Sequence, residues 1–274
     1  METLIKSIDY FSDGQKTVEL VIVLNQPTEE LKALVIMLER DFGTRFIFNV
    51  VTIEQCNLGV AYNMGLKHAK YDHVLFLDSD LTCHENGIEQ IIAHYRKFEP
   101  HIIKAKVTFE YQDTCIGRAI YEARTASTTE IKMPYIPVIF MRKDIFNVIN
   151  DGYMFAQDTV WCSDADFAKR VLAKQLQVDY LNVYFSHPRI GLKKDLKDAF
   201  FYGLGKGIRV RRTKESWSVI QDIKDTMTIP EGFHISNSGK VYLCLWCFLL
   251  QAGCAIQQLL PNHSILKQSI EFDD

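Results

Sequence analysis

The chain has 274 residues, 47% of them hydrophobic and 24% charged, and its 31 Lys and Arg against 34 Asp and Glu give a formal net charge of −3. This composition is that of a globular protein and excludes a disordered chain, a collagen-like repeat and a coiled coil. The slightly acidic balance lacks the basic excess that sequence-independent nucleic-acid binding requires, so we expect no nucleic-acid partner.

The N-terminus and the cysteines both indicate a cytoplasmic protein. Residues 1–9 contain early acidic residues and lack the apolar stretch of a secretory signal. The seven cysteines are scattered along the chain, which is typical of reduced thiols that are buried as small hydrophobic residues. Only Cys244 and Cys247 form a C-x-x-C pair, and the absence of a second pair favours a core or membrane-facing position over a metal site.

The first 80 residues alternate short apolar runs with amphipathic stretches. Val18–Leu24 is rich in β-branched residues and predicts a buried strand. The spacing of apolar residues predicts four further elements, in chain order a helix over 28–40, a strand over 45–51, a helix over 57–69 and a strand over 74–77. This alternation predicts an α/β fold with a parallel sheet, and such sheets bind ligands beyond the carboxyl ends of their strands.

Asp78-Ser79-Asp80 follows the third predicted strand. In an extended segment, carboxylates at i and i+2 project to the same side and repel each other unless a cation lies between them. Mg²⁺ and Mn²⁺ prefer such oxygen ligands and keep open positions for substrate phosphates. A plain turn after a strand explains the same three residues, and on the D-x-D pattern alone we favour the turn.

Six short segments occur in a fixed order further along the chain. They are Asn57-Leu58-Gly59, Asn63-Met64-Gly65-Leu66, His73–Asp80, Phe140–Phe146, Asn150–Tyr153 and Trp161–Arg170. Together they resemble family 2 glycosyltransferases. The first three segments resemble the half of that family that binds the nucleotide sugar, and the last three resemble the half that binds the acceptor. The resemblance extends over residues 17–210 and implies the GT-A fold, a Rossmann-like and mostly parallel sheet flanked by helices. We therefore expect a catalytic domain over residues 1–215 and a C-terminal helical extension over 216–274.

The resemblance implies a metal-dependent inverting transfer of a sugar from a nucleoside diphosphate sugar, most simply a UDP-sugar, to a hydroxyl of a glycan, lipid or peptide acceptor. Mn²⁺ or Mg²⁺ would neutralise the departing diphosphate, and a carboxylate would take the proton of the acceptor hydroxyl. On the matching positions, the metal ligands would be Asp78, Asp80 and His187. The residues that bind the donor would be Asn25, Asn57, Asn63, Asp78 and Arg209. The candidate bases, in order of preference, are Asp164, Asp166 and Asp158.

The sequence also departs from the family pattern. Tyr62 stands where an arginine is common, Ser163 stands where a glutamate is usual, and Thr52–Cys56 replaces the acidic turn that often contacts the base. These departures keep open a degenerate, non-catalytic module that binds sugar nucleotides with the same fold. A sugar nucleotidyltransferase is a second alternative, but residues 25–30 contain no glycine-rich phosphate loop.

Asp166 and His187, two of the candidate site residues, can also be explained by their place in the secondary structure. The S-x-x-D spacing of Ser163 and Asp166 is typical of a helix start, with Ser163 as the N-cap and Asp166 in the first turn. This explanation leaves Asp164 as the preferred base. His187 follows a strand predicted over 178–185, where a solvent-exposed position explains it as well as metal binding does.

Residues 200–212 combine glycines with cations. This pattern predicts either a mobile loop whose cations close over a diphosphate or a helix that ends at Gly203 with a solvated basic face. Attraction of these cations to anionic lipid headgroups is a third interpretation.

Val241–Leu260 is apolar and nearly long enough to span a bilayer. Its three glutamines favour a helix that packs on the domain or lies in a membrane interface over a true span. We expect peripheral contact of residues 241–260 with the inner face of a membrane, and homo-oligomerisation is the alternative use of this segment.

Overall fold

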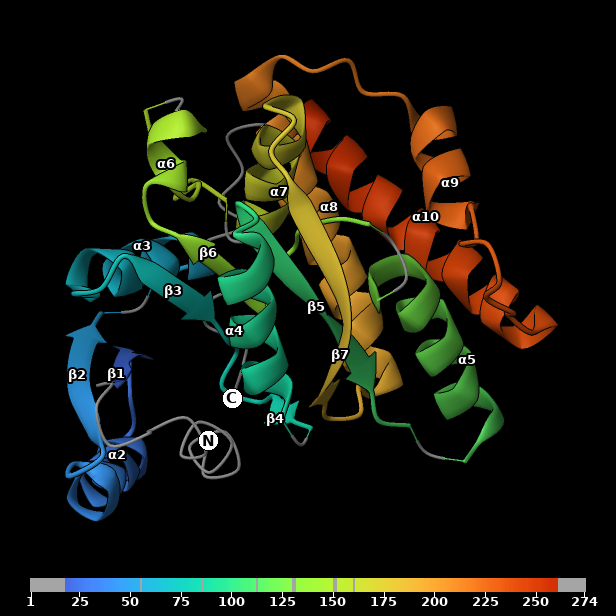
Figure 1. Cartoon of the computed structure of the whole chain (residues 1–274). Coiled ribbons are helices and arrows are strands. Elements are labelled where there is room, and N and C mark those ends of the chain that lie inside the picture. Colours follow the sequence, from blue (N-terminus) through green and yellow to red (C-terminus); the bar gives the residue numbers. More distant parts are fainter. Residues whose placement is uncertain are drawn as a thin grey trace. The chain divides into compact units, whose positions relative to one another are not determined.

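The computed structural model describes residues 18–260 except Gln55, Glu85, Gln112, Glu130, Ile131, Asn150, Asp151 and Val160 (Figure 1). Residues 1–9, which carry the signal prediction, lie outside the described residues, as do Asn150 and Asp151 of the acceptor segment.

The chain divides into two compact units, and each unit combines three separate chain segments. Unit 1 contains Met1–Lys106, Pro134–Ala156 and Phe167–Phe185. Unit 2 contains Val107–Met133, Gln157–Asp166 and Ser186–Asp274. The predicted domain boundary between residues 215 and 216 stays a prediction.

The N-terminal part of unit 1 confirms the predicted order of strands and helices. The elements are β1 (Val18–Asn25), α2 (Glu29–Phe42), β2 (Phe46–Ile53), α3 (Leu58–His68) and β3 (His73–Phe76). β1 and β2 pair in parallel, with Val18 opposite Phe46 and Asn25 opposite Ile53. α3 packs against both strands.

A second, five-stranded sheet has the strand order β3-β6-β5-β7-β4. Its other strands are β4 (Thr82–Cys83), β5 (Ile102–Phe109), β6 (Ile139–Arg142) and β7 (Val178–His187). β6 runs antiparallel to both β3 and β5, so β3 belongs to a sheet with antiparallel pairs and not to the parallel pair of β1 and β2. The helices of this region are α4 (Gly87–Phe98), α6 (Ile145–Val148) and α7 (Ser163–Ala173). The α/β class predicted from the sequence is confirmed.

The core of unit 1 is a continuous cluster of aliphatic and aromatic side chains. Phe146, Phe155 and Phe167 lie with ring centroids between 5.1 and 5.9 Å apart. Ile139 and Met141 of β6 are fully buried in the same cluster. Burial of this many large side chains is the main stabilising contribution to the unit.

Unit 2 is mainly helical. It contains α5 (Cys115–Arg124), the π-helical turn η1 (Thr125–Thr129), α8 (Leu192–Thr213), α9 (Val219–Met227) and α10 (Asn237–Leu259). α10 packs along α8 and α5 (Figure 1). A polar link joins these three helices inside their apolar core: the Tyr242 hydroxyl donates to Asp195 over 2.7 Å, and Asp195 lies 3.5 Å from the Arg124 Nε.

The glycine-rich segment does not behave as the sequence predicts. α8 continues through Gly203, Gly205 and Gly207 to Thr213, so the mobile loop and the helix end at Gly203 are both wrong. A Cβ on Gly203 would overlap the Leu250 carbonyl oxygen, and one on Gly207 would lie 2.7 Å from the Gln257 Cβ. These glycines let the backbones of α8 and α10 approach closely, which no larger residue permits.

The predicted helix over 241–260 is confirmed as α10. Among the described residues, α10 is the one helix that is long and apolar enough to cross a membrane by length and composition, with a mean hydropathy of 1.5 over its most apolar stretch. The protein buries 44% of that stretch. Val241, Leu245 and Phe248 form an exposed apolar stripe on its outer side.

Candidate functional site

The acidic segment forms a turn directly after β3. The Leu81 N–H donates to the Asp78 carbonyl over 3.3 Å, which places Ser79 and Asp80 at the centre of the turn. Asp78 is half-buried and Asp80 is exposed. The predicted turn is therefore present. Because Asp80 lies in a turn and not in an extended strand, the rule that side chains at i and i+2 point to the same side does not apply to the two carboxylates. The case for a metal here rests on two carboxylates that lie two residues apart in the sequence at the end of a strand.

Tyr62 of α3 reaches the carboxylate of Asp78. Its hydroxyl lies 3.5 Å from Asp78 Oδ1, and its ring packs edge-on against Phe76 with centroids 5.8 Å apart. The sequence singles out Tyr62 only as a departure from the family pattern. Tyr62 lies one helical turn before Leu66, so both side chains are on the face of α3 that was predicted to face the core. This spacing is the sequence signal that could have placed Tyr62 near the end of β3.

The three predicted donor-binding asparagines all hold backbone groups within unit 1. Asn25 donates to the Cys56 carbonyl over 2.8 Å and accepts from the Cys56 N–H over 3.0 Å. Asn63, which is 7% exposed, makes the same pair of bonds with Phe155, both of 2.9 Å. Asn57 is the N-cap of α3 and accepts from the Val60 N–H. These bonds satisfy backbone groups at chain reversals.

His187 lies at the end of β7 in unit 2. Its Nδ1 is 2.6 Å from the Pro188 carbonyl oxygen, which can only accept, so Nδ1 carries the proton. In the neutral ring Nε2 then carries the lone pair that a metal would use. Within the described residues, no group of three or more His, Cys, Asp and Glu side chains gathers at a metal site. The oxygen donors of Asp78 and Asp80 are nevertheless of the type that suits Mg²⁺ and Mn²⁺.

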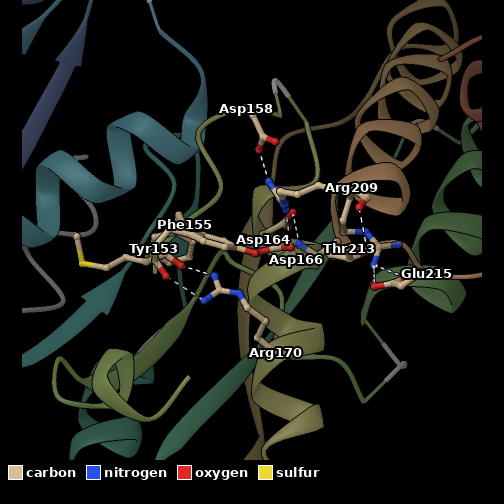
Figure 2. Close-up of polar contacts among 12 residues, drawn as sticks. Tyr153, Phe155, Asp158, Asp164, Asp166, Arg170, Arg209, Thr213 and Glu215 are labelled. Carbon is tan, nitrogen blue, oxygen red and sulfur yellow. Dashed lines mark hydrogen bonds and ion pairs between the residues drawn. The ribbon is translucent and has the colours of Figure 1, made fainter. Parts of the chain in front are cut away.

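The candidate bases Asp164 and Asp166 lie in the first turn of α7 (Figure 2). The Asp166 N–H donates to the Cys162 carbonyl over 3.0 Å, so Cys162, with a φ of 72°, is the N-cap. The prediction of Ser163 as the N-cap is therefore wrong by one residue. The Asp164 carboxylate accepts from the Ala165 N–H over 2.8 Å and is half-buried, whereas Asp166 is 2% exposed.

Arg212, at the end of α8, joins two of the candidate carboxylates. One guanidinium nitrogen donates to Asp166 over 2.6 Å, and the other donates to Asp158. The Asp158 side chain is 50% exposed. From the sequence, Arg212 is known only as one of the cations of the glycine-rich segment. Its partners lie 46 and 54 positions earlier in the chain, and no local pattern indicates pairing over such separations.

Two further arginines have structural partners. Arg209, predicted to bind the donor, is 4% exposed and makes two bonds to Glu215 of 3.1 and 3.0 Å (Figure 2). Arg170 of α7 donates to the carbonyls of Ile149, Tyr153 and Met154 within unit 1. Arg170 therefore holds the loop whose other end is fixed by Asn63.

Burial also sets the chemistry of Cys162, the residue before α7. It raises the pKa of this thiol to about 12, and the neighbouring charge of Asp164 adds to the effect. Cys162 is therefore a neutral thiol at physiological pH.

Comparison with known proteins identifies a family. The model of "Glycosyl transferase family 2" matches residues 2–161, more than half of the chain. The matched range contains the acidic turn and the three asparagines, and it ends before Asp164, Asp166, His187 and Arg209.

Individual relatives are more distant. The poly(ribitol-phosphate) beta-N-acetylglucosaminyltransferase TarP of Staphylococcus aureus (strain N315) is 31% identical over 75 residues, which are 27% of this chain and 23% of TarP. The structure of S. aureus TarS 1-349 in complex with UDP-GlcNAc is 14% identical, with a TM-score of 0.50 over 97% of this chain and 87% of that chain. This chain covers 60% of the TarS 1-349 chain in complex with UDP and 51% of a further TarS chain, so it spans less than two thirds of the length of these relatives.

A mannosyltransferase gives a second structural match. PcManGT from Pyrobaculum calidifontis, in complex with GDP-Man and Mn2+, is 13% identical, with a TM-score of 0.54 over 98% of this chain and 75% of that chain. At this identity the likeness concerns the fold alone. The expected GT-A fold is thereby confirmed.

Proposed function

Because the chain belongs to glycosyl transferase family 2, we propose that it is an enzyme that transfers a sugar from a nucleoside diphosphate sugar to a hydroxyl acceptor. The observation that carries this proposal is the family match over residues 2–161, which contains the Asp78–Asp80 turn at the end of β3. The GT-A fold shared with PcManGT agrees with it.

We propose that Asp78 and Asp80, with His187, would hold Mn²⁺ or Mg²⁺. A bound metal supplies the positive charge that neutralises a departing diphosphate. The donor atoms support this assignment, since carboxylate oxygens suit both ions and the Nδ1–H bond of His187 leaves Nε2 for coordination. Tyr62 would restrain Asp78 through its hydroxyl.

We propose Asp164 as the general base, which takes the proton from the acceptor hydroxyl in a direct, inverting displacement. Asp166 is a weaker candidate because it is 2% exposed and forms an ion pair with Arg212. A base must come within hydrogen-bond reach of the proton that it removes. The half-buried Asp164 carboxylate meets this requirement better than the buried one.

We propose UDP-N-acetylglucosamine as the first donor to test, because the curated relative TarP is named as a beta-N-acetylglucosaminyltransferase. The acceptor would be a hydroxyl of a glycan, lipid or peptide. Asn25, Asn57, Asn63 and Arg209 would contribute to donor binding through the backbone segments and the helix end that they hold.

We propose that the enzyme works in the cytoplasm. The exposed stripe of Val241, Leu245 and Phe248 would provide peripheral contact with the inner face of a membrane, as an amphipathic helix does, or contact with a second copy of the chain.

A nucleotide-release assay tests the proposal. The chain is incubated with a panel of UDP- and GDP-sugars, with Mn²⁺, with Mg²⁺ and with a chelator. We expect release from at least one donor, loss of release with the chelator, and strong loss in Asp80→Asn. Full release with the chelator, or full activity of Asp80→Asn, would contradict the metal assignment. Binding of a sugar nucleotide without release would favour a degenerate module, and pyrophosphate release from a nucleoside triphosphate and a sugar phosphate would indicate a nucleotidyltransferase.

A further inference from the structure

Arg212 occupies an unusual position between two acidic side chains of unit 2. Its guanidinium group bridges Asp158, in the segment before α7, and Asp166, in the first turn of α7. We infer that Arg212 is a positioning residue that fixes the start of α7 and thereby the orientation of the proposed base Asp164. The inference rests on the proposed function, because it gives Arg212 a task in the same reaction.

The first step is that Asp166 requires a cation. Its side chain is 2% exposed, and an ionised carboxylate at this depth is costly unless it is paired and hydrogen-bonded. Arg212 provides that charge at 2.6 Å. The planar fork of the arginine allows a second carboxylate, that of Asp158, to bind at the same time, which the single ammonium of a lysine does less well.

The second step is that the segment carrying Asp164 is held against α8 at three levels. The Cys162 thiol donates to the Tyr202 carbonyl over 3.2 Å. A Cβ on Gly205 would overlap the Trp161 carbonyl oxygen, so the two backbones touch there. Arg212 makes the third attachment, two turns further along α8, and it is the one that involves the helical turn of Asp164 itself.

The third step is that Asp164 and Asp166 share one helical turn. Because Asp164 lies two residues before Asp166, a shift of the first turn of α7 moves both carboxylates together. Small displacements of a reacting group lower a rate strongly, with about 10²-fold lost for a misplacement of about 1 Å. Arg212 would therefore affect the chemical step without any contact with the donor.

The test compares Arg212→Lys and Arg212→Gln with the wild-type chain in the nucleotide-release assay. Arg118→Gln is the matched control, since Arg118 forms an exposed ion pair with Asp113 in the same unit. Donor KM and kcat are measured for each variant. The stoichiometry of nucleotide binding is measured by calorimetry, because a partly unfolded preparation would lose binding sites together with kcat.

We expect kcat to fall about tenfold in Arg212→Lys and about a hundredfold in Arg212→Gln, following the cost of misplacing a catalytic group. Donor KM stays within about twofold of wild type and binding stoichiometry is unchanged, because only positioning is lost. Arg118→Gln behaves as wild type.

Three results would overturn the inference while leaving the proposed function intact. The first is a wild-type kcat in Arg212→Lys. The second is a rise in donor KM with kcat retained, which would mean that Arg212 binds the donor directly. The third is a fall in binding stoichiometry that matches the fall in kcat, which would mean that Arg212 has only a structural role. If the wild-type chain releases nucleotide from no donor, the proposed function itself fails and the inference fails with it.

Discussion

Asparagine side chains illustrate how much a motif residue can do for the fold. The family pattern assigns Asn25, Asn57 and Asn63 to donor binding, and in the structure each side chain bonds to the backbone of unit 1. The two statements are compatible, because a loop that binds a nucleotide must first be held in place. The sequence could not reveal the partners Cys56 and Phe155. Cys56 lies 31 positions after Asn25 and Phe155 lies 92 positions after Asn63, and no local pattern indicates a contact over such separations.

Asn63→Ala is expected to destabilise the protein by about 2–3 kcal/mol, since it leaves the buried N–H and carbonyl of Phe155 without partners. Urea unfolding measures the change. Asn57→Ser is the control and should stay within about 0.5 kcal/mol of wild type, because serine also caps a helix. A loss smaller than that of the control would show that Asn63 does not hold the Phe155 loop.

Thiol reactivity separates the cysteines by burial. Cys115 and Cys244 are exposed, whereas burial raises the pKa of Cys162 to about 12 and that of Cys254 to about 11. A raised pKa keeps a thiol protonated at pH 8, and the protonated form is not the nucleophile. We expect a thiol reagent at pH 8 to modify Cys115 and Cys244 first, and Cys162 and Cys254 only after unfolding. Rapid modification of Cys162 in the native chain, identified by mass spectrometry of its peptide, would contradict this assignment.

Secondary structure was predictable where its cause is local. The strands and helices of residues 18–76 follow from apolar spacing, and the structure differs from the prediction by one or two residues at nine of their ten ends. β5 was not predicted, because Lys104 interrupts its apolar run. Lys104 is 8% exposed, and its ammonium group donates to the Pro137 carbonyl over 2.6 Å.

α8 shows the opposite failure, in which a local rule gave the wrong answer. Glycines lower helix propensity by about 1 kcal/mol each, so three of them predict an interruption. Their actual cause is non-local: they face Leu250 and Gln257 of α10 and Trp161 before α7. A helix that packs this closely has to accept the propensity cost of glycine.

Gly203→Ala tests this explanation. Alanine would stabilise an isolated helix, yet here its Cβ overlaps the Leu250 carbonyl, and we expect a loss of about 2 kcal/mol or more. Gly191→Ala is the control, since no atom of the described residues lies within 4 Å of its added Cβ; because Gly191 is the N-cap of α8, where alanine is less favourable, it should lose no more than about 1 kcal/mol. Thermal unfolding at matched conditions measures both. A Gly203→Ala chain as stable as wild type would refute the close contact of α8 with α10.

At the scale of the whole molecule, the order of short motifs identified the family, and the family match and the fold both agree with it. The candidate site was only partly predictable. The resemblance proposes Asp164 and Asp166 as site residues, and these assignments stay predictions. It did not reveal the contacts of Arg212 with Asp166 and of Tyr62 with Asp78, because side-chain partners that are distant in sequence depend on the assembled fold. The division of the chain at residue 215 stays a prediction beside the two interleaved units of the structure.

The most direct test of the account is donor turnover by Asp164→Asn, measured together with donor affinity and compared with Asp166→Asn. The account predicts that Asp164→Asn loses about 10²–10⁴-fold in kcat, the typical contribution of a general base, while it binds the nucleotide sugar as the wild type does. Asp166→Asn should lose less, because its amide oxygen can still accept from Arg212. Wild-type turnover in Asp164→Asn with normal donor binding would contradict the account.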